Sequence, residues 1–271
     1  MRPFFENNVL QQQPFKPMII VVDTTKAGSA SNTFVLPIIK DTTETVKIYW
    51  GDGTNSMGVN GDNTHVYASS GVYTIKIESR LFGGIYFNNL GDKAKITKIA
   101  NYGQGVSRLN IGSFFGCSSL LSIAIGNIVS NGAVATNQYR GCTALTTVPL
   151  FNLSRVTNAY AMFAYCTALT TVPLFDLSSV TNAGSMFYQC SNITTVPLLN
   201  LSKVTNASNM FFGVTLTTQS YSDFLINLAT LPLQSGVSFH GGDSKYNPTA
   251  AIARAYLVSN FGWTITDGGA A

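Results

Sequence analysis

Charged side chains are scarce in this chain: Asp, Glu, Lys and Arg together make up 10% of the 271 residues, and the formal net charge is +4. The positive charges are spread along the sequence without a Lys/Arg cluster, which excludes the basic patch that nucleic-acid-binding proteins use. Thr, Ser, Asn and Gly supply the polar surface instead. This composition is typical of β-rich proteins that work outside a cytoplasm, and it predicts no nucleic-acid partner.

Groups for acid–base chemistry are also few. The chain has two histidines, His65 and His240, which we expect in different domains. Residues 142–213 contain one acidic residue, Asp176, whereas glycoside hydrolysis needs paired carboxylates about 5–10 Å apart. Gly-x-Ser-x-Gly, P-loop and zinc motifs are missing from the sequence. We therefore predict no catalytic residue, no metal site and no cofactor.

Long apolar runs are missing as well. The N-terminal region has one short run, Met18 to Val22, whereas a secretory signal needs roughly 7–15 apolar residues and a membrane span about 20. We expect no membrane insertion. A surface of extracellular type without an export address favours a protein released by cell lysis, such as a bacteriophage virion component. A signal trimmed from the sequence is the alternative.

A repeat of 24 residues dominates the middle of the chain. Its copies are CTALTTVPLFNLSRVTNAYAMFAY (142–165), CTALTTVPLFDLSSVTNAGSMFYQ (166–189) and CSNITTVPLLNLSKVTNASNMFFG (190–213). The first two copies agree at 18 of 24 positions. A period of this length predicts a solenoid, in which each unit buries its apolar side against its neighbours. Solenoids mostly present surfaces, so the repeat favours binding over catalysis.

Cysteine marks the register of the repeat. Cys117, Cys142, Cys166 and Cys190 recur at nearly constant spacing, and Val214 takes the next equivalent position. Replacement by Val indicates a small apolar slot, so we expect buried, reduced thiols. The spacing excludes a zinc pattern, but stacking would bring neighbouring sulfurs close enough for a disulfide, which is the alternative.

Other positions stay apolar in every copy and are predicted to form the core: Leu145/Leu169/Ile193, Val148/Val172/Val196, Leu150/Leu174/Leu198, Leu153/Leu177/Leu201, Val156/Val180/Val204 and Phe163/Phe187/Phe211. The segment TTVPL is predicted to be a short strand or extended edge. Asn158, Asn182 and Asn206 recur within VTN, and we expect a structural ladder in which each amide bonds backbone of its own and the next turn.

Positions that vary between copies are predicted to be mostly exposed: Phe151/Phe175/Leu199, Arg155/Ser179/Lys203, Tyr160/Gly184/Ser208, Ala161/Ser185/Asn209, Ala164/Tyr188/Phe212 and Tyr165/Gln189/Gly213. Among them Tyr160, Tyr165, Tyr188 and Phe212 are the candidate binding residues, since aromatic faces give contact area at low entropic cost. Random surface variation is the alternative.

The flanks of the repeat also carry signals. Phe114, Cys117, Leu120 and Ile123 lie in phase and indicate an earlier, degraded turn. Residues 221–231 predict a short amphipathic helix. Asn247 and Pro248 predict the start of a second helix and Gly262 its end, followed by a final strand in WTITDGG. We interpret residues 214–271 as an α/β cap that hides the last turn.

The repeat frame C-s-x-L-T-t-x-P…L-s-x-V-T-N…M-F over residues 114–213 resembles the BspA-type leucine-rich repeats of bacterial surface proteins and phage virion proteins. The run from Tyr221 to GWTITDGG resembles the ending common among phage-borne members. The resemblance implies adhesion or host-surface contact without catalysis, and it brings no defined set of functional residues.

Upstream, Trp50-Gly51-Asp52-Gly53-Thr54, His65-Val66-Tyr67 and GVYTIKI (71–77) resemble a PKD-type immunoglobulin-like sandwich. These pieces indicate a strand, a tight turn and a second alternating strand. Asp52, Asp62 and His65 suggest a metal site, but their spacing fits no known loop. We expect Asp52 to organise its turn instead.

Residues 1–17 contain three prolines and too few apolar residues to fold alone, so they form either a tail or an arm that orders on a partner, with Phe4, Phe5 and Phe15 as candidate anchors. The fold prediction is a multi-domain, mainly β protein: an arm (1–17), a PKD/Ig-like β-sandwich (18–100), a leucine-rich-repeat solenoid (101–213) and an α/β C-terminal cap (214–271).

The predicted function is that of a non-catalytic virion-surface protein of a tailed bacteriophage, as head decoration, fibre or tail-tip component. The expected partners are other virion proteins, through the arm and the sandwich, and a host-surface glycan or protein. A bacterial cell-surface adhesin is the alternative.

Overall fold

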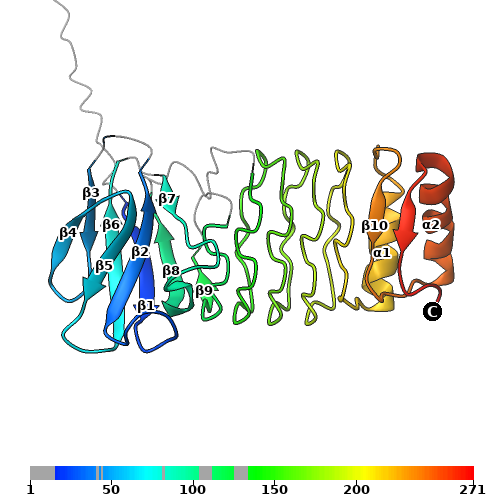
Figure 1. Ribbon diagram of the computed structural model, residues 1–271. Coiled ribbons are helices and arrows are strands. Elements are labelled where there is room, and N and C mark those ends of the chain that lie inside the picture. The colour runs from blue at the N-terminus through cyan, green and yellow to red at the C-terminus, as the bar shows by residue number, and fades with distance from the viewer. Residues whose placement is uncertain (1–15, 41–42, 44, 81–82, 104–111, 125–133) are drawn as a thin grey trace, which may run out of the picture.

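The computed structural model describes residues 16–40, 43, 45–80, 83–103, 112–124 and 134–271. The protein is mainly β, with 25% of its residues in strands and 12% in helices, as the sequence predicted. The molecule is elongated: strands gather at the N-terminal end, stacked turns of chain form the middle, and two α-helices lie at the C-terminal end (Figure 1).

Two sheets form the N-terminal part. The larger has the order β4-β3-β6-β1-β8-β9 and the smaller the order β5-β2-β7. Their strands are β1 (Met18–Asp23), β2 (Thr33–Ile39), β3 (Val46–Tyr49), β4 (Asn55–Gly58), β5 (Gly61–Val66), β6 (Val72–Glu78), β7 (Gly84–Ile85), β8 (Ile96–Tyr102) and β9 (Ser122–Ile123), and a 3₁₀ turn, η1 (Lys93–Lys95), precedes β8. Alternating burial along β1 and β2 directs every second side chain into the shared core.

The predicted turn after β3 is present. Gly51 and Gly53 both have positive φ, and Asp52 accepts hydrogen bonds from the backbone N–H and the hydroxyl of Thr54, at 2.9 and 2.6 Å. Asp52 therefore organises its turn, as expected. Trp50 is buried behind it and donates from Nε1 to the Ser56 hydroxyl at 3.0 Å.

A buried ion pair, which the sequence did not predict, holds the loop between β1 and β2. The Lys95 ammonium and the Asp92 carboxylate are both buried, with 3.7 Å between Nζ and Oδ2. Lys95 donates to the carbonyl oxygens of Ser29, Ala30 and Thr33, and Asp92 accepts from Ser29 and from the Val35 N–H. These bonds compensate for the desolvation of both charges.

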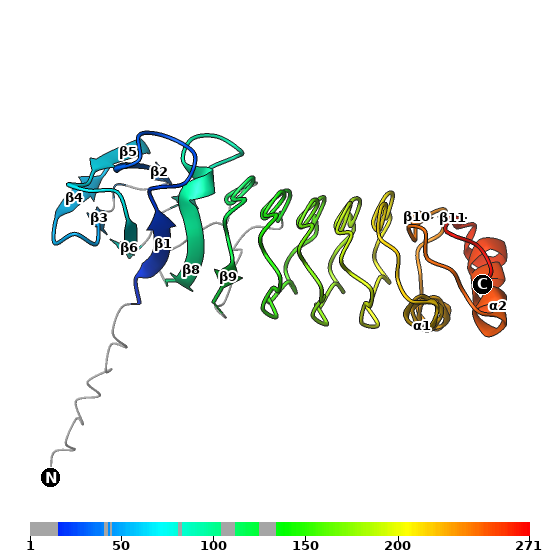
Figure 2. The same ribbon diagram turned by 90° about the horizontal axis from the view of Figure 1, so that it is seen from below.

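Successive copies of the repeat are stacked on one another, so that residues 24 apart lie side by side (Figures 1 and 2). Parallel bridges join Asn158 to Asn182 and Asn182 to Asn206. Backbone N–H groups donate to the following copy, for example Phe163 to Met186 at 3.0 Å and Tyr165 to Tyr188 at 2.7 Å. Each turn therefore satisfies backbone groups of its neighbour, although the described part of residues 125–213 contains isolated bridges rather than strands.

The predicted asparagine ladder is present in part. The Asn206 amide donates from Nδ2 to Oδ1 of Asn182, in the adjacent copy, at 3.1 Å. Within each copy the asparagine Oδ1 also accepts the N–H two residues later, that of Tyr160, Gly184 or Ser208. These residues are half-buried and hold the start of each turn.

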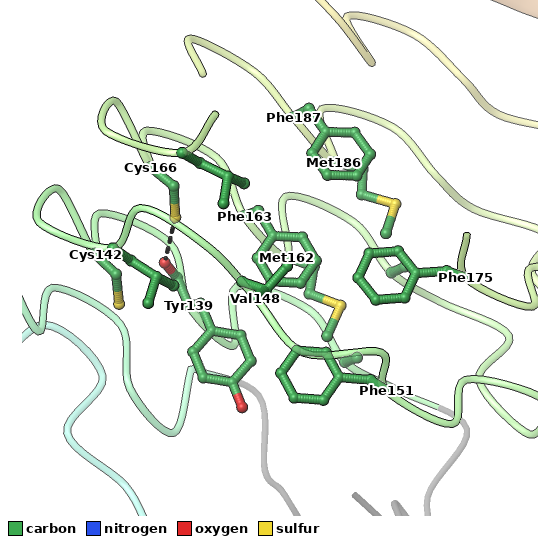
Figure 3. Close-up of a cluster of buried hydrophobic side chains, with 14 of the residues drawn as sticks. Tyr139, Cys142, Val148, Phe151, Met162, Phe163, Cys166, Phe175, Met186 and Phe187 are labelled. Atoms are coloured by element: carbon green, nitrogen blue, oxygen red, sulfur yellow. Dashed lines mark hydrogen bonds between the residues drawn. The ribbon is translucent and has the colours of Figure 1, made fainter. Parts of the chain in front are cut away.

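The core of the stack contains two columns of nearly parallel rings (Figure 3). One column consists of Tyr139, Phe163, Phe187 and Phe211, with centroids 5.6–5.7 Å apart. The other places Phe151 6.1 Å from Phe175, and Leu199 continues it. The prediction that Phe151, Phe175 and Leu199 are exposed is therefore wrong, and so is the prediction of exposure for Ala161, Ala164 and Gly184, all of which are buried.

The opposite error concerns Leu150, Leu174 and Leu198, which were predicted in the core but are 61%, 61% and 52% exposed. The Phe175 N–H donates to the Pro173 carbonyl at 2.8 Å, and Leu199 to Pro197 at 2.9 Å. Such a three-residue turn rotates the chain at the leucine. The leucine consequently points outward and the next residue points into the core.

The four cysteines are buried and free, as predicted. The earlier, degraded turn is part of the same stack, because Phe114 is stacked on Tyr139 with centroids 5.8 Å apart. The Tyr102 and Tyr139 hydroxyls are hydrogen-bonded to each other, which joins β8 to the ring column. β8 runs through residue 100 and pairs with β1 on one side and with β9 on the other, so the sheet and the stack share this strand.

The C-terminal part covers the last turn. It consists of α1 (Thr218–Leu228), β10 (Ser238–His240), α2 (Pro248–Phe261) and β11 (Thr264–Thr266). The boundaries of α2 are as predicted, with Asn247 as N-cap and Gly262 at φ +66° after its end. α1 begins three residues earlier than predicted, because the Thr217 side chain caps it. Phe224 and Phe239 contact Phe211 edge-on and close the ring column. Within the described residues, neither helix combines the length and the apolar character of a membrane span.

Candidate functional site

The candidate binding residues lie on or near one edge of the stack. Tyr160 and Tyr165 are 38% and 39% exposed, and Tyr188 and Phe212 are half-buried. Tyr188 contacts Tyr165 on one side and Phe212 on the other, and Tyr160 lines the same pocket as Tyr165 and Tyr188. The proposed anchors Phe4, Phe5 and Phe15 lie outside the described residues.

The contacts extend into a continuous aromatic row, which we define as Phe115, Arg140, Tyr165, Tyr188, Phe212 and His240. The Arg140 guanidinium lies over the Phe115 ring at 5.2 Å and over the Tyr165 ring at 5.3 Å. The ring centroids of Tyr165 and Tyr188 lie 5.3 Å apart in an edge contact. Tyr188 is stacked on Phe212 with centroids 5.0 Å apart, and Phe212 contacts His240 edge-on at 5.2 Å. One side chain from each successive turn of the stack thus forms the row, and His240 of β10 continues it.

The row departs from the repeat at one position. Phe115, Arg140, Ala164, Tyr188 and Phe212 occupy equivalent places before the cysteine or valine slot, but Ala164 is buried. Tyr165, the following residue, takes its place in the row through its contacts with Arg140 and Tyr188. A row assembled from two sequence positions cannot be recognised by counting a single period.

Tyr165 has an unusual backbone conformation for an aromatic residue, with φ +63°. Gly116, Gly141, Gln189 and Gly213 occupy the equivalent place in the other turns, and all four share a positive φ between +58° and +80°. The left-handed region suits glycine and costs a bulky residue about 1–2 kcal/mol. The left-handed conformation is therefore a feature of each turn of the stack, and Tyr165 adopts it with an aromatic side chain.

A pocket of about 190 Å³ lies against the row. Its polar and aromatic lining includes Arg140, Tyr160, Tyr165, Ser185, Tyr188 and Asn209. Three of the four predicted binding residues line it, whereas Phe212 belongs to the row alone. Arg140, Phe115 and His240 were not predicted. The equivalence of position 140 with 188 and 212 is the signal that would have identified Arg140.

A second concavity of about 630 Å³ lies between the last copy of the repeat and α1. Thr195, Leu198 and Thr217 line one side, and Asp223 and Ile226 of α1 line the other. Leu198 continues the outward row of Leu150 and Leu174, so an exposed leucine stripe leads to this groove. Its lining contains no arrangement of rings and cations like that of the aromatic row.

The thiols are unsuited to chemistry. Burial raises the pKa of Cys117, Cys142 and Cys166 strongly, and that of Cys190 to about 12. A protonated thiol without solvent access is neither a nucleophile nor a metal ligand.

His65 and Asp52 are joined by a hydrogen bond with 2.7 Å between Nε2 and Oδ2. Desolvation opposes ionisation of Asp52, but hydrogen bonds from Thr54 and His65 outweigh it and lower the pKa of Asp52 to about 2. The His65 ring is also stacked on Trp50, with centroids 4.8 Å apart. The pair supports the turn after β3. Among the described residues, no three His, Cys, Asp or Glu side chains are grouped as a metal site would require.

Comparison with known proteins connects the stack to one family model. Residues 135–228 match a model described as "Mycoplasma protein of unknown function, DUF285". The matched segment runs from the turn that contains Arg140 to the end of α1. No curated protein and no solved structure matched the chain. The central part of this protein, about a third of its length, is therefore similar to the DUF285 family.

Proposed function

We propose that the protein is a non-catalytic surface-contact protein that binds its target through the aromatic row. The observation that carries this proposal is the row itself: Arg140, Tyr165, Tyr188 and Phe212 present rings and a cation along one edge of a stack whose two core ring columns are buried. Rigid aromatic side chains lose little entropy on binding and provide a large contact area.

The positions of reactive groups support a non-catalytic role. The thiols are buried inside the stack, and the Asp52–His65 pair is engaged with Thr54 and Trp50. The pocket beside the row brings together tyrosines, an arginine and small polar side chains. This lining suits recognition, because it has donors and ring faces but no carboxylate or thiol.

In its specific form, the proposal assigns the protein to the surface of a tailed-bacteriophage particle, as head decoration, fibre or tail-tip component. The two N-terminal sheets are interpreted as a PKD/Ig-like sandwich, the stack as a BspA-type leucine-rich-repeat solenoid and the C-terminal helices as its cap. The resemblance of the repeat to that of phage virion proteins supports this assignment. Residues 1–17 and the sheets would attach to the particle, with the stack directed outward.

A bacterial cell-surface adhesin is the second candidate. It is favoured by the match of residues 135–228 to a family described from a Mycoplasma protein. Both candidates use the aromatic row in the same way and differ in the structure that carries the protein.

Antibody labelling distinguishes the carriers. Gold-labelled antibody against the purified protein is expected to decorate phage particles from a lysate of the source culture. Labelling of intact cells but not of particles would overturn the virion assignment in favour of the adhesin. Labelling of neither particles nor cells would overturn both assignments. Removal of residues 1–17 is expected to abolish incorporation into particles while leaving the remaining chain folded.

Cell binding tests the contact surface. The fluorescently labelled protein is expected to bind host cells, and Tyr188→Ala combined with Phe212→Ala should reduce that binding at least about tenfold. Tyr256→Ala is the matched control, because this tyrosine is 42% exposed on α2, away from the row. Equal binding by both variants would overturn the proposed role of the row.

A further inference from the structure

We infer that the pocket beside the aromatic row binds a carboxylate-bearing sugar, such as a sialic acid or uronic acid unit of a surface glycan. This inference rests on the proposed function, because it names the chemical class that the row would contact. Three properties of the pocket support it: an oriented guanidinium, ring faces of suitable size and a positive local charge.

Arg140 provides the charge and its orientation. Its guanidinium lies between the rings of Phe115 and Tyr165, at 5.2 and 5.3 Å, which fixes the plane of the group. Among the described residues no carboxylate forms an ion pair with it, and its hydrogen bond to Asn137 Oδ1 is long at 3.5 Å. A planar guanidinium with free N–H groups matches a carboxylate in a bidentate pair.

The tyrosines provide the surface for a sugar ring. Tyr160, Tyr165 and Tyr188 line the same pocket as Arg140, and Ser185 and Asn209 add a hydroxyl and an amide that suit sugar hydroxyls. A volume of about 190 Å³ corresponds to about six waters at ~30 Å³ each, which is room for one monosaccharide. The half-buried ring of Phe212, stacked on Tyr188, continues this surface beyond the pocket and gives apolar contact area for an adjoining sugar.

The local charge favours an anion. The pocket lining has one cationic side chain, Arg140, and no Asp or Glu, so its local charge is +1. The one anionic side chain of residues 134–213, Asp176, lies outside this lining. The Asp176 carboxylate is engaged in its own turn, where it accepts from the Ser178 N–H and hydroxyl at 3.1 and 2.6 Å. A positive surface attracts acidic ligands and discriminates against neutral ones.

Titration of the full-length protein tests this inference. The probes are tetragalacturonate and sialyllactose, with methyl-esterified tetragalacturonate and lactose as their neutral counterparts. We expect at least one acidic probe to bind about tenfold or more tightly than its neutral counterpart, with an affinity that falls as salt rises. Arg140→Gln should remove this preference, whereas Arg140→Lys should retain part of it because the charge remains without the planar fork.

Arg155→Gln is the matched control, since it removes the same charge from an exposed position elsewhere on the stack and should leave binding unchanged. Thermal unfolding of each variant verifies that it is folded. Tyr188→Ala is a second binding variant that leaves Arg140 in place, and it should weaken both acidic and neutral probes.

The outcomes separate this inference from the proposed function. Equal binding of acidic and neutral probes, or retention of the preference by Arg140→Gln, overturns the acidic-sugar site. If no probe binds while host-cell binding still depends on Tyr188 and Phe212, the site is overturned and the surface-contact function stands. If no probe binds and host-cell binding does not depend on Tyr188 and Phe212, both the acidic-sugar site and the surface-contact function are overturned.

Discussion

The Cys166 thiol donates a hydrogen bond to the carbonyl oxygen of Tyr139, in the preceding turn, with an Sγ–O distance of 3.2 Å (Figure 3). Cys142 makes the same bond to Phe114 at 3.4 Å, and Cys190 to Phe163 at 3.0 Å. The cysteine is therefore more than a small apolar filler, because it supplies a donor to a buried carbonyl of the neighbouring turn. Its recurrence at this position has a physical reason in the stack.

Replacement of Cys166 by serine is expected to destabilise the protein by about 1–3 kcal/mol, because the shorter C–O bond leaves a buried hydroxyl poorly placed for the Tyr139 carbonyl. The free energy of unfolding in urea measures this effect. The native thiols should also resist a thiol-specific label until the protein unfolds. Rapid labelling of the folded protein would contradict the burial of the ladder.

Phe175 and Leu174 are adjacent residues with opposite roles. Phe175→Ala removes a buried ring from the core column and is expected to cost about 3–5 kcal/mol. Leu174→Ala acts on a side chain that is 61% exposed and should change stability by less than about 1 kcal/mol. Chemical denaturation of the two variants in parallel compares them. A larger loss for the leucine would contradict the direction that the three-residue turn imposes.

Tyr165→Gly is expected to reduce binding while leaving the free energy of unfolding within about 1 kcal/mol of wild type. Relief of the left-handed conformation recovers about 1–2 kcal/mol, which offsets the ring contacts with Tyr188 and Arg140, worth about 0.5–1.5 kcal/mol each. Thermal unfolding and host-cell binding are measured on the same preparation. A large loss of stability would show that Tyr165 is kept for the fold.

The Asp52–His65 pair predicts a pH dependence. The folded pKa of Asp52, about 2, lies below its ordinary value of 3.8, so the stability that it contributes is present above the ordinary value and is lost as pH falls through this window. Wild type should therefore lose more stability than Asp52→Asn between about pH 5 and about pH 2. Urea midpoints at the two pH values provide the comparison. Identical losses would contradict a stabilising role for the ionised carboxylate.

Much of the fold was evident from the sequence because the signals are local or periodic. The limits of α2 follow from the capping side chain of Asn247 and the left-handed Gly262, which act within one turn of helix. The burial of Cys166 and Phe163 follows from repetition, since a position that stays apolar in every copy meets its own kind in the next turn. The Asp52 turn required only its own two glycines and Thr54.

Other features depend on contacts that no local pattern records. Apolar residues in every copy placed Leu150 inside and variation between copies placed Phe151 outside, but the turn after the proline reversed them, because a side chain's direction depends on backbone angles that the apolar pattern does not specify. In the aromatic row Tyr165 replaces the buried Ala164 as the ring of its turn. Arg140 joins the row only because stacking brings different turns together. The sequence alone determined the period, most of the buried slots and the limits of α2. The tertiary structure decided which side chains face outward and which of them meet, since both depend on how neighbouring turns pack.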